Sequence, residues 1–399
     1  MKSIFPTYGS KNLARFYVLT ILQNTWFIAP NWVFYFARFM TIQRVGLIDS
    51  LSKIVSLVIE VPTGAIADKF GRKKSLVFGH LALALCCMVI VIANNFSLLL
   101  LGNIIMFIGF SLLSGAKEAL LYDNMKAEKI DHHYEHVLGR IGFIVTVSSV
   151  TTIFLGGLLY KIAPEATFYV WGTANVIAIF VLAGIKEHSF GQHEEHATSS
   201  YFSKISDGIR TLFSRRLIVY TSLILYLAML IKSYEGVIRQ STSMYFGLTG
   251  ETFAYLFAIV SIPSAIASYN FGRLFKKFGY RILVIILSSY IFGFITIFLF
   301  KNLPAFLVSF ILIYVSQELA KPLITVTVNR HTDSSHRATT LSVVSLLSEI
   351  PYIVITGLFG SILLNVNINK FYLVQAIIVS FASLSIVIYG ILQRSRGST

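Results

Sequence analysis

Eleven charged side chains lie inside segments of the chain that are otherwise apolar. They are Asp49, Lys53, Glu60, Lys117, Glu118, Lys232, Glu235, Arg239, Glu318, Lys321 and Glu349. A charge at the centre of a bilayer costs roughly 2.5–3.5 kcal/mol on insertion scales, so such residues usually face a partner or an aqueous path. Apolar surroundings favour the protonated form of a carboxylate, and a neighbouring cation opposes this. These side chains are therefore candidates for proton transfer or for binding a polar solute.

The spacing of the first of these charges predicts one polar face on a helix. At 100° per residue, Asp49, Lys53, Ser56 and Glu60 fall within about 40° of one another. Glu60 is assigned a structural role, because it lies close to Pro62, which we expect to end its helix. Asp49 and Lys53 remain candidates for a functional site.

Similar polar stripes are expected on four other apolar segments. Their members are Asn24, Asn31, Tyr35 and Arg38; Ser111, Ser114 and Glu118; Lys232, Glu235 and Arg239; and Glu318, Lys321 and Thr325. Each stripe would point toward an aqueous path between two halves of the molecule.

Several of these charges form acid–base pairs one helical turn apart, and two interpretations remain open. In the first, the partners neutralise each other and hold helices in register. In the second they couple to protons, because moving the cation would change the proton affinity of the acid. Glu235 is the first candidate for this role, since it lies between Lys232 and Arg239. The next candidates are Asp49, Glu118 and Glu349.

Composition places the whole chain in a membrane. The 399 residues are 55% hydrophobic and only 13% charged, whereas a soluble domain carries about 25% charged residues. Apolar stretches of about 20 residues, enough to cross a bilayer, recur throughout. About twelve spans are predicted, near 16–37, 46–66, 75–94, 97–121, 138–160, 166–185, 217–240, 251–271, 280–300, 304–328, 338–364 and 370–392.

The net charge of +15 has a simpler explanation than nucleic-acid binding. With the N-terminus inside, the inner segments hold 23 Lys and Arg residues and the outer loops hold 5. This bias predicts that both termini are cytoplasmic. The only cysteines, Cys86 and Cys87, are adjacent in an apolar segment and suit neither a disulfide framework nor a metal site. No cofactor is expected.

One long polar connection divides the chain. We expect an N-terminal six-helix bundle over 1–185, a cytoplasmic linker over 186–216 and a C-terminal six-helix bundle over 217–399. The second half of the linker has apolar residues at helical spacing among cations, which predicts an amphipathic helix on the inner membrane surface.

A short loop pattern occurs twice. The segment GAIADKFGRKK begins at Gly64, and GRLFKKFGYR begins at Gly272, 208 residues later. The residues that match at this offset are Gly64 with Gly272, Lys69 with Lys277, Phe70 with Phe278, Gly71 with Gly279, and Lys73 with Arg281. Such internal repeats are typical of transporter folds.

On these residues the sequence resembles the Major Facilitator Superfamily. The segment EVPTGAIADKFGRKKSL is similar to that family's loop signature, and the segments SGAKEALLYDNM, GRIG and NRHTDSSHRATTLS resemble a bacterial exporter-like branch. The resemblance implies an all-α membrane protein, with twelve transmembrane helices in two pseudo-symmetric six-helix bundles. It also implies a monomer in the bacterial cytoplasmic membrane that works by alternating access.

The two glycines of the first loop have distinct expected roles. Gly64 would let two helices approach closely, and Gly71 would permit a tight turn with positive φ. The second loop carries Lys276 and Tyr280 where the first has an acid and an arginine. We therefore expect a charged latch on the N-terminal half only.

The resemblance implies the partners in this latch. Asp68 would meet the N-terminal end of span eleven, near Arg337, where the helix dipole favours an anion. Arg72 would pair with Asp123, and Arg140 is a further member. Together these residues would hold the outward-facing state.

No catalytic motif of a soluble enzyme is present, so an enzyme is not expected. The favoured function is proton-coupled export of a small organic compound, either a drug or a metabolite. An alternative is import of an anionic or polar metabolite, in which Lys53, Lys232, Arg239 and Lys321 bind the anion. A third is a lipid-handling protein or a non-transporting sensor on the same scaffold. The expected partners are a small-molecule substrate, protons or another coupling ion, and membrane lipids.

Overall fold

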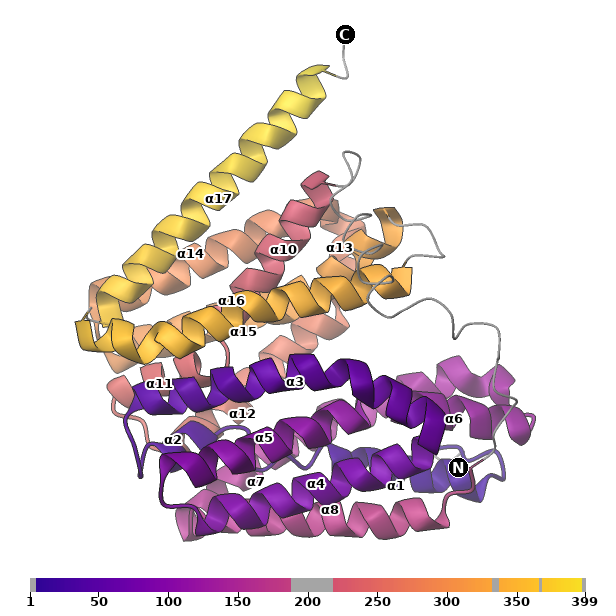
Figure 1. Ribbon diagram of the computed structural model, residues 1–399. Coiled ribbons are helices and arrows are strands. Elements are labelled where there is room, and N and C mark those ends of the chain that lie inside the picture. Colours follow the sequence, from indigo (N-terminus) through magenta and orange to yellow (C-terminus); the bar gives the residue numbers. More distant parts are fainter. Residues whose placement is uncertain (1–4, 188–217, 332–336, 366–367, 397–399) are drawn as a thin grey trace. The chain divides into compact units, whose positions relative to one another are not determined.

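The computed structural model describes residues 5–187, 218–331, 337–365 and 368–396, with the side chains of residues 60–70 and of parts of the last two helices left out. All regular elements in these ranges are helices (Figure 1). The chain divides into two compact units. Unit 1 comprises residues 1–198 with 249–258, and unit 2 comprises 199–248 with 259–399. The predicted linker boundaries stay a prediction, and the predicted surface helix lies outside the described residues.

Unit 1 contains the first eight α-helices. They are α1 (Lys11–Gln23), α2 (Trp32–Phe36), α3 (Ile42–Phe70), α4 (Arg72–Ile92), α5 (Phe96–Leu113), α6 (Ala116–Ala127), α7 (Tyr134–Ile162) and α8 (Ala166–Gly184). Local sequence explains two of the starts: Ser10 accepts a hydrogen bond from the Leu13 N–H, and Asn95 accepts one from the Leu98 N–H.

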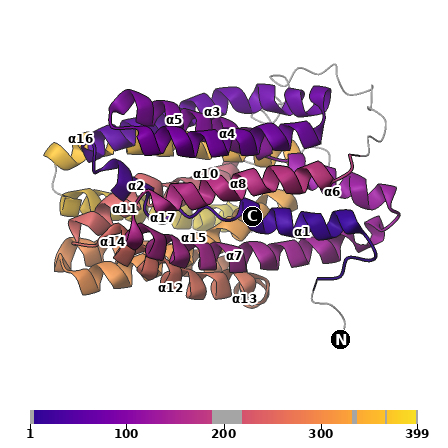
Figure 2. The ribbon, with the colours of Figure 1, turned by 90° about the horizontal axis from the view of Figure 1, so that it is seen from below.

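Helices α3, α4 and α5 run side by side within unit 1 (Figures 1 and 2). Glycines allow α4 and α5 to approach closely. A Cβ on Gly79 would lie 3.1 Å from the Gly109 carbonyl oxygen, and one on Gly109 would lie 3.0 Å from that of Gly79. Small residues at such contacts are the usual solution for helices packed in a membrane.

The first copy of the repeated loop is shorter than the sequence suggested. Helix α3 passes through Pro62 and ends only at Phe70, so the expectation that Pro62 ends this helix is wrong. Gly71 alone separates α3 from α4, with φ of +100°. The predicted positive φ at Gly71 is confirmed, and most of the predicted loop is helix.

Unit 2 contains the remaining described α-helices, apart from the first residues of α12. They are α10 (Ile218–Lys232), α11 (Gly236–Tyr245), α12 (Gly250–Tyr269), α13 (Phe271–Phe278), α14 (Ile282–Phe300), α15 (Leu303–His331), α16 (Arg337–Asn365) and α17 (Ile368–Arg396). An aromatic core holds several of them together. Tyr234 contacts Phe294, Phe310 and Tyr372, with ring centroids 6.2–6.4 Å apart.

Helix α12 is divided between the units. Its first residues, up to Ala258, cluster with unit 1, and the rest with unit 2. Within unit 1, the Lys161 ammonium lies 3.1 Å from the Glu251 carboxylate. A Cβ on Gly157 of α7 would lie 2.9 Å from that of Ala254. Pro263 interrupts the hydrogen bonding of α12 shortly after the division.

Seven helices of the described part are long and apolar enough to cross a membrane, and a bent pair in α10 and α11 makes an eighth. The chain is therefore an integral membrane protein. The predicted total of twelve spans is not reached by this criterion, and two of the predicted spans are broken. Span one comprises α1 and α2 with a non-helical connection, and span seven comprises α10 and α11.

Candidate functional site

Span seven is broken where the sequence places its charges. Helix α10 ends at Lys232, α11 begins at Gly236, and their axes differ by 42°. Such a break leaves backbone carbonyls without helical partners, which is costly in a membrane unless another group satisfies them. The Gln317 side-chain amide donates to the carbonyls of Ile231 and Tyr234, at 2.8 and 3.3 Å. Gln317 therefore stabilises the break.

Three charged side chains meet at this break. The Lys232 Nζ lies 2.9 Å from Glu235 Oε2 and 2.8 Å from Glu349 Oε1. Glu349 belongs to α16, which packs against α10 (Figure 1). The side chains of Lys232 and Glu349 are 19% and 13% exposed, and that of Glu235 is 36% exposed. We call these three residues the Lys232 cluster.

The charges of the Lys232 cluster leave room for one proton. Taken alone, two ionised carboxylates and one ammonium carry a net charge of −1; Arg239 acts electrostatically on Glu235 and offsets part of this charge, and a proton on either acid also offsets it. Because neutral groups are cheaper in a membrane than charged ones, the arrangement can take up and release a proton as its surroundings change. The Tyr352 ring, with its centroid 5.6 Å from Lys232 Nζ, forms part of those surroundings.

The sequence expected Glu235 to lie between two cations. Lys232 contacts Glu235 directly. The Arg239 guanidinium stacks on Tyr314, 5.5 Å from the ring centroid, and also acts electrostatically on Glu235. Arg239 is only 8% exposed. The second partner of Lys232 is instead Glu349, which the sequence ranked as a separate candidate.

A second acid–base pair of unit 2 follows the predicted spacing. Glu318 and Lys321 form an ion pair on α15, one turn apart, with side chains 20% and 52% exposed. The greater exposure of Lys321 makes this pair weaker than one shielded from solvent.

Span one of unit 1 is broken in a corresponding place. Helix α1 ends at Gln23 and α2 begins at Trp32. Asn31 is fully buried, and its side-chain amide donates to the Gly156 carbonyl at 3.1 Å. A Cβ on Gly156 would overlap the Phe27 carbonyl oxygen, so only glycine allows the broken segment to approach α7 this closely. Within the described part, the Asn31 Oδ1 and the Tyr35 hydroxyl are buried without a hydrogen-bond partner.

The two breaks are related by the repeat. At the 208-residue offset of the loops, Lys232 corresponds to Asn24 and Arg239 to Asn31. Each unit therefore interrupts its first span at the same point of the repeat. Interrupted helices in corresponding positions of two halves are a general marker of the binding region in transporters.

Other predicted site residues of unit 1 are placed as follows. Asp49 is buried on α3, and Lys53 Nζ lies 5.2 Å from the centroid of the Phe107 ring. Glu118, at the start of α6, is 55% exposed in its side chain and 3.6 Å from Lys117 Nζ. Glu118 is therefore closer to solvent than a buried proton carrier would be.

Part of the predicted latch is present. Arg72, in the first turn of α4, forms an ion pair with Asp123 of α6. Arg140 forms no ion pair within the described part of the chain. The backbones of Gly64 and Asp68 lie in α3 and Arg337 begins α16, but the side chains of Asp68 and Arg337 lie outside the described residues. The contact of Asp68 with span eleven stays a prediction.

Lys73 has a role that the sequence did not reveal. Its Nζ donates to the carbonyls of Ala183 and Ile185, at 3.0 and 2.7 Å. These carbonyls lie at the C-terminal end of α8, where helices lack internal donors and favour cations. Nothing in local spacing links Lys73 to a helix about 110 residues later in the chain.

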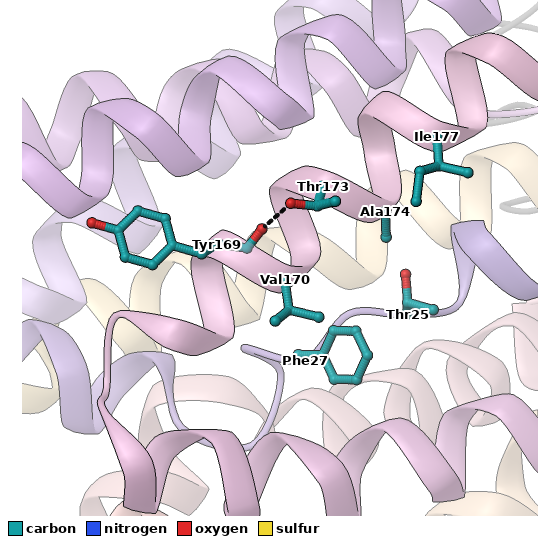
Figure 3. Close-up of a pocket in the computed structure, with 7 residues that line it drawn as sticks. All are labelled: Thr25, Phe27, Tyr169, Val170, Thr173, Ala174 and Ile177. Carbon is teal, nitrogen blue, oxygen red and sulfur yellow. Dashed lines mark hydrogen bonds between the residues drawn. The ribbon is translucent and has the colours of Figure 1, made fainter.

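An apolar cavity of about 340 Å³ lies beside the break in span one. Its lining comes from the connection between α1 and α2 and from one face of α8 (Figure 3): Thr25, Phe27, Tyr169, Val170, Thr173, Ala174 and Ile177. The Thr173 hydroxyl donates to the Tyr169 carbonyl, so it is already satisfied. With no charged residue in the lining, this cavity is distinct from the charged clusters. No group of metal-binding side chains occurs among the described residues.

Comparisons with known proteins identify the family. The sequence model of the Major Facilitator Superfamily matches residues 13–238 and 237–398. The chloramphenicol resistance protein CraA of Acinetobacter baumannii is 26% identical over 38% of this chain and 35% of its own length. Multidrug resistance protein 2 of Bacillus subtilis is 22% identical over 70% of each chain. Only about a third of CraA is therefore matched.

A solved structure supports the same fold. The nucleoside transporter NupG, in the form of a point mutant, superposes with a TM-score of 0.78 at 12% identity, covering 94% of this chain and 98% of that one. The family match extends over almost the whole chain. The helical architecture agrees with this match. The chain is a membrane transporter, not an enzyme, and belongs to the Major Facilitator Superfamily.

Proposed function

We propose that this protein exports a small organic compound, a drug or a metabolite, in exchange for protons by alternating access. The observation that carries the proposal is the Lys232 cluster at the break of span seven, where two carboxylates share one ammonium. The names of CraA and multidrug resistance protein 2 support export of a drug-like substrate.

In this proposal the proton and the conformational change are linked through Lys232. When Lys232 contacts both acids, it stabilises their ionised forms. If α10 and α16 separate, one carboxylate loses its cation and takes up a proton. Closing the contact again expels that proton. Glu235 and Glu349 are the two positions at which it would be held, and Asn31 and Tyr35 are proposed to contact substrate in unit 1.

The test uses purified protein in proteoliposomes, with chloramphenicol as the first substrate. We expect an imposed pH gradient to drive transport by the unmodified protein. Glu235→Gln and Glu349→Gln should each lose the gradient-driven part while keeping substrate exchange without a gradient. Glu135→Gln, which removes an exposed acid at the start of α7, is the control and should behave as the unmodified protein.

Retained exchange in the variants would establish that they are folded and bind substrate. If both Gln variants transport as well as the unmodified protein under the gradient, the coupling role of the Lys232 cluster is wrong. Because the double variant leaves the ammonium of Lys232 without an acid, it should also be less stable than either single variant.

Import of an anionic metabolite is the second candidate, favoured by the nearly buried Arg239 of α11. A buried cation in a transporter marks a substrate or ion pathway. Under this alternative, Arg239→Gln would abolish uptake of anions and would leave flux of a neutral compound such as chloramphenicol unchanged. In the same proteoliposomes, the two functions differ in the direction of transport and in the charge of the substrate that is transported.

We further propose that the protein lies as a monomer in the cytoplasmic membrane with both termini inside. Single cysteines placed in the N-terminal segment and after α17, in a variant that lacks Cys86 and Cys87, should react with a membrane-impermeant thiol reagent only in inverted vesicles. Labelling in intact cells would contradict this orientation.

A further inference from the structure

The second copy of the repeated loop is built differently from the first. In unit 1 a single residue, Gly71, separates two long helices. In unit 2 the corresponding connection contains a separate helix, α13, followed by a single 3-10 turn at Gly279–Arg281. At the 208-residue offset α13 corresponds to residues 63–70 at the end of α3, so in unit 2 the equivalent helix is interrupted at Asn270 and its last part forms a separate element.

Helix α13 has one apolar and one basic face. Phe271 is buried and Phe275 is partly buried against unit 2. Arg273, Lys276 and Lys277 are exposed. Helix α13 lies between the apolar helices α12 and α14 and carries exposed cations, so we expect this basic face to lie at the depth of the lipid headgroups.

An aromatic platform adds a further cation to the same surface. The rings of Phe275 and Phe271 stack with centroids 5.5 Å apart, and Tyr280 meets Phe275 edge-on at 5.5 Å. The Arg330 guanidinium of α15 lies over Phe275, 4.8 Å from the ring centroid. The contact is a cation–π interaction, and it holds Arg330 beside α13.

The cations of this surface are not neutralised by acids within the part of the protein that the structure describes. They are Arg273, Lys276, Lys277, Arg281 and Arg330, all exposed. Within the described ranges, none of them forms an ion pair with an acid, and residues 270–282 contain no Asp or Glu. The hydrogen bond of 3.4 Å from Arg273 to the neutral Asn270 side chain leaves its charge uncompensated.

The first copy of the loop shows the opposite arrangement. There Arg72 is paired with Asp123, and Lys73 is held by the carbonyls that end α8. Lys73 and its counterpart Arg281 therefore differ, because Arg281 is exposed and forms no ion pair within the described residues.

We propose that the basic face of α13, with Arg281 and Arg330, binds the headgroups of anionic phospholipids. The partner carries a phosphodiester anion, which complements the five cations, and its acyl chains lie beside the partly exposed Phe278. An amphipathic helix with cations on its polar face and aromatic residues on the other binds an anionic membrane surface in this way. This inference does not depend on the substrate or on proton coupling.

The test uses the full-length protein in nanodiscs of phosphatidylcholine with and without phosphatidylglycerol. Native mass spectrometry gives the ratio of the two lipids that stay bound, and thermal unfolding gives the effect on stability. The variant is Arg273→Gln/Lys276→Gln/Lys277→Gln. A matched control, Arg44→Gln/Lys301→Gln/Lys370→Gln, removes three other exposed cations.

We expect the unmodified protein to retain phosphatidylglycerol preferentially and to melt at a higher temperature when it is present. The α13 variant should lose this preference roughly tenfold or more and should melt unchanged in pure phosphatidylcholine, while the control keeps the preference. If the triple variant does not fold, Lys276→Gln/Lys277→Gln carries the same expectation with a smaller loss.

Three results would overturn the proposal. They are an absence of preference in the unmodified protein, an equal loss in the control, and displacement of bound phosphatidylglycerol by soluble glycerol phosphate. The last result would assign the surface to a free phosphate-bearing solute instead of a lipid.

Discussion

Single residues decide whether the break in span seven can exist. Gly236, the first residue of α11, has φ of +51°, a conformation that costs other residues about 1–2 kcal/mol. The space is also closed, because a Cβ at this position would overlap the Tyr352 hydroxyl. Backbone strain and a steric clash therefore act together at the residue that follows Glu235.

Gly236→Ala should lower the melting temperature of the purified protein and weaken the Lys232 cluster, because Tyr352 must move. Gly247→Ala is the matched control, since its φ is +80° but nothing lies within 4 Å of the added Cβ. Both variants lose stability because alanine disfavours a positive φ. Only Gly236→Ala should lose additional stability, through the clash with Tyr352. Adding Tyr352→Phe should recover part of that loss by removing the clashing oxygen, and no recovery would contradict the clash.

The ion pair of Arg72 and Asp123 gives a second prediction about single residues. Their side chains are 36% and 21% exposed, so solvent screening limits the coupling to about 0.5–1 kcal/mol. A double-mutant cycle with Arg72→Ala and Asp123→Ala, read by thermal unfolding, should give that coupling. The exposed Lys74 provides the control, since Lys74→Ala with Asp123→Ala should be additive.

Connections between helices are stabilised by residues from other helices. Arg38, after α2, forms an ion pair of 2.7 Å with Glu165, in the turn between α7 and α8. Partial burial raises the pKa of the Glu165 carboxyl, but its own backbone N–H and the Arg38 guanidinium outweigh this and hold the pKa below its ordinary value. The pair therefore links two connections of unit 1 in a pH-dependent way.

The sign of this dependence follows from the lowered pKa. Above the unfolded value near 4.5, the pair contributes its full stability, and the contribution is lost as the pH falls through the folded-state pKa. Since the side chains are 43% and 30% exposed, it amounts to about 0.2–1 kcal/mol. Melting temperatures of the unmodified protein and Glu165→Gln should differ at pH 7 and converge under acid. A constant difference would contradict the assignment.

Helical periodicity predicted the local part of the candidate site and could not predict the rest. Lys232 with Glu235 and Glu318 with Lys321 were expected because residues three apart share a helix face. The contact of Glu349 with Lys232 depends on how α16 packs on α10, which spacing along one helix does not contain. Hydropathy predicted span seven as continuous, because the average over some twenty residues hides the short polar segment of Lys232, Ser233 and Glu235, and the Gln317 amide that stabilises the break comes from another helix.

The repeat predicted the breaks in the first span of each unit better than the hydropathy of the spans did. The 208-residue offset relates Asn24 to Lys232, so a break found in one unit predicts the other. The fold family could be inferred from the loop signature. The separate helix α13 could not, because no turn signal marks its start at Phe271, and the first copy runs through the equivalent position as one helix. Arg72 and Lys73 of the first copy have partners within the protein, whereas the cations of the second copy form no ion pair among the described residues.

At the scale of the whole molecule, the connection between the units is not confined to the central linker. Helix α12 belongs to unit 1 up to Ala258 and to unit 2 beyond it. Alternating access requires the halves of a transporter to move relative to each other. If the protein works by alternating access as proposed, we expect that movement to deform α12 or to detach its first residues from the rest of unit 1.

Replacing Pro263 tests where the deformation occurs. Pro263→Ala supplies the missing backbone N–H, so α12 gains a hydrogen bond to the Ile259 carbonyl and becomes stiffer. We expect slower substrate exchange in proteoliposomes with unchanged substrate affinity. The control is Pro322→Ala in α15, a helix that lies within one unit, and it should leave the rate unaffected. Equal effects would show that α12 has no special part in the movement.

The division of α12 also bears on how this protein could be taken apart. Many two-unit proteins can be expressed as separate halves cut at the central linker. A cut at residues 186–216 would leave the Lys161–Glu251 contact to be made between separate polypeptides. The N-terminal fragment would lack Thr249–Ala258, and its α7 would present Gly157 without the residues that cover it. Co-expressed halves should therefore assemble through the outer end of α12, and an N-terminal half expressed alone should aggregate.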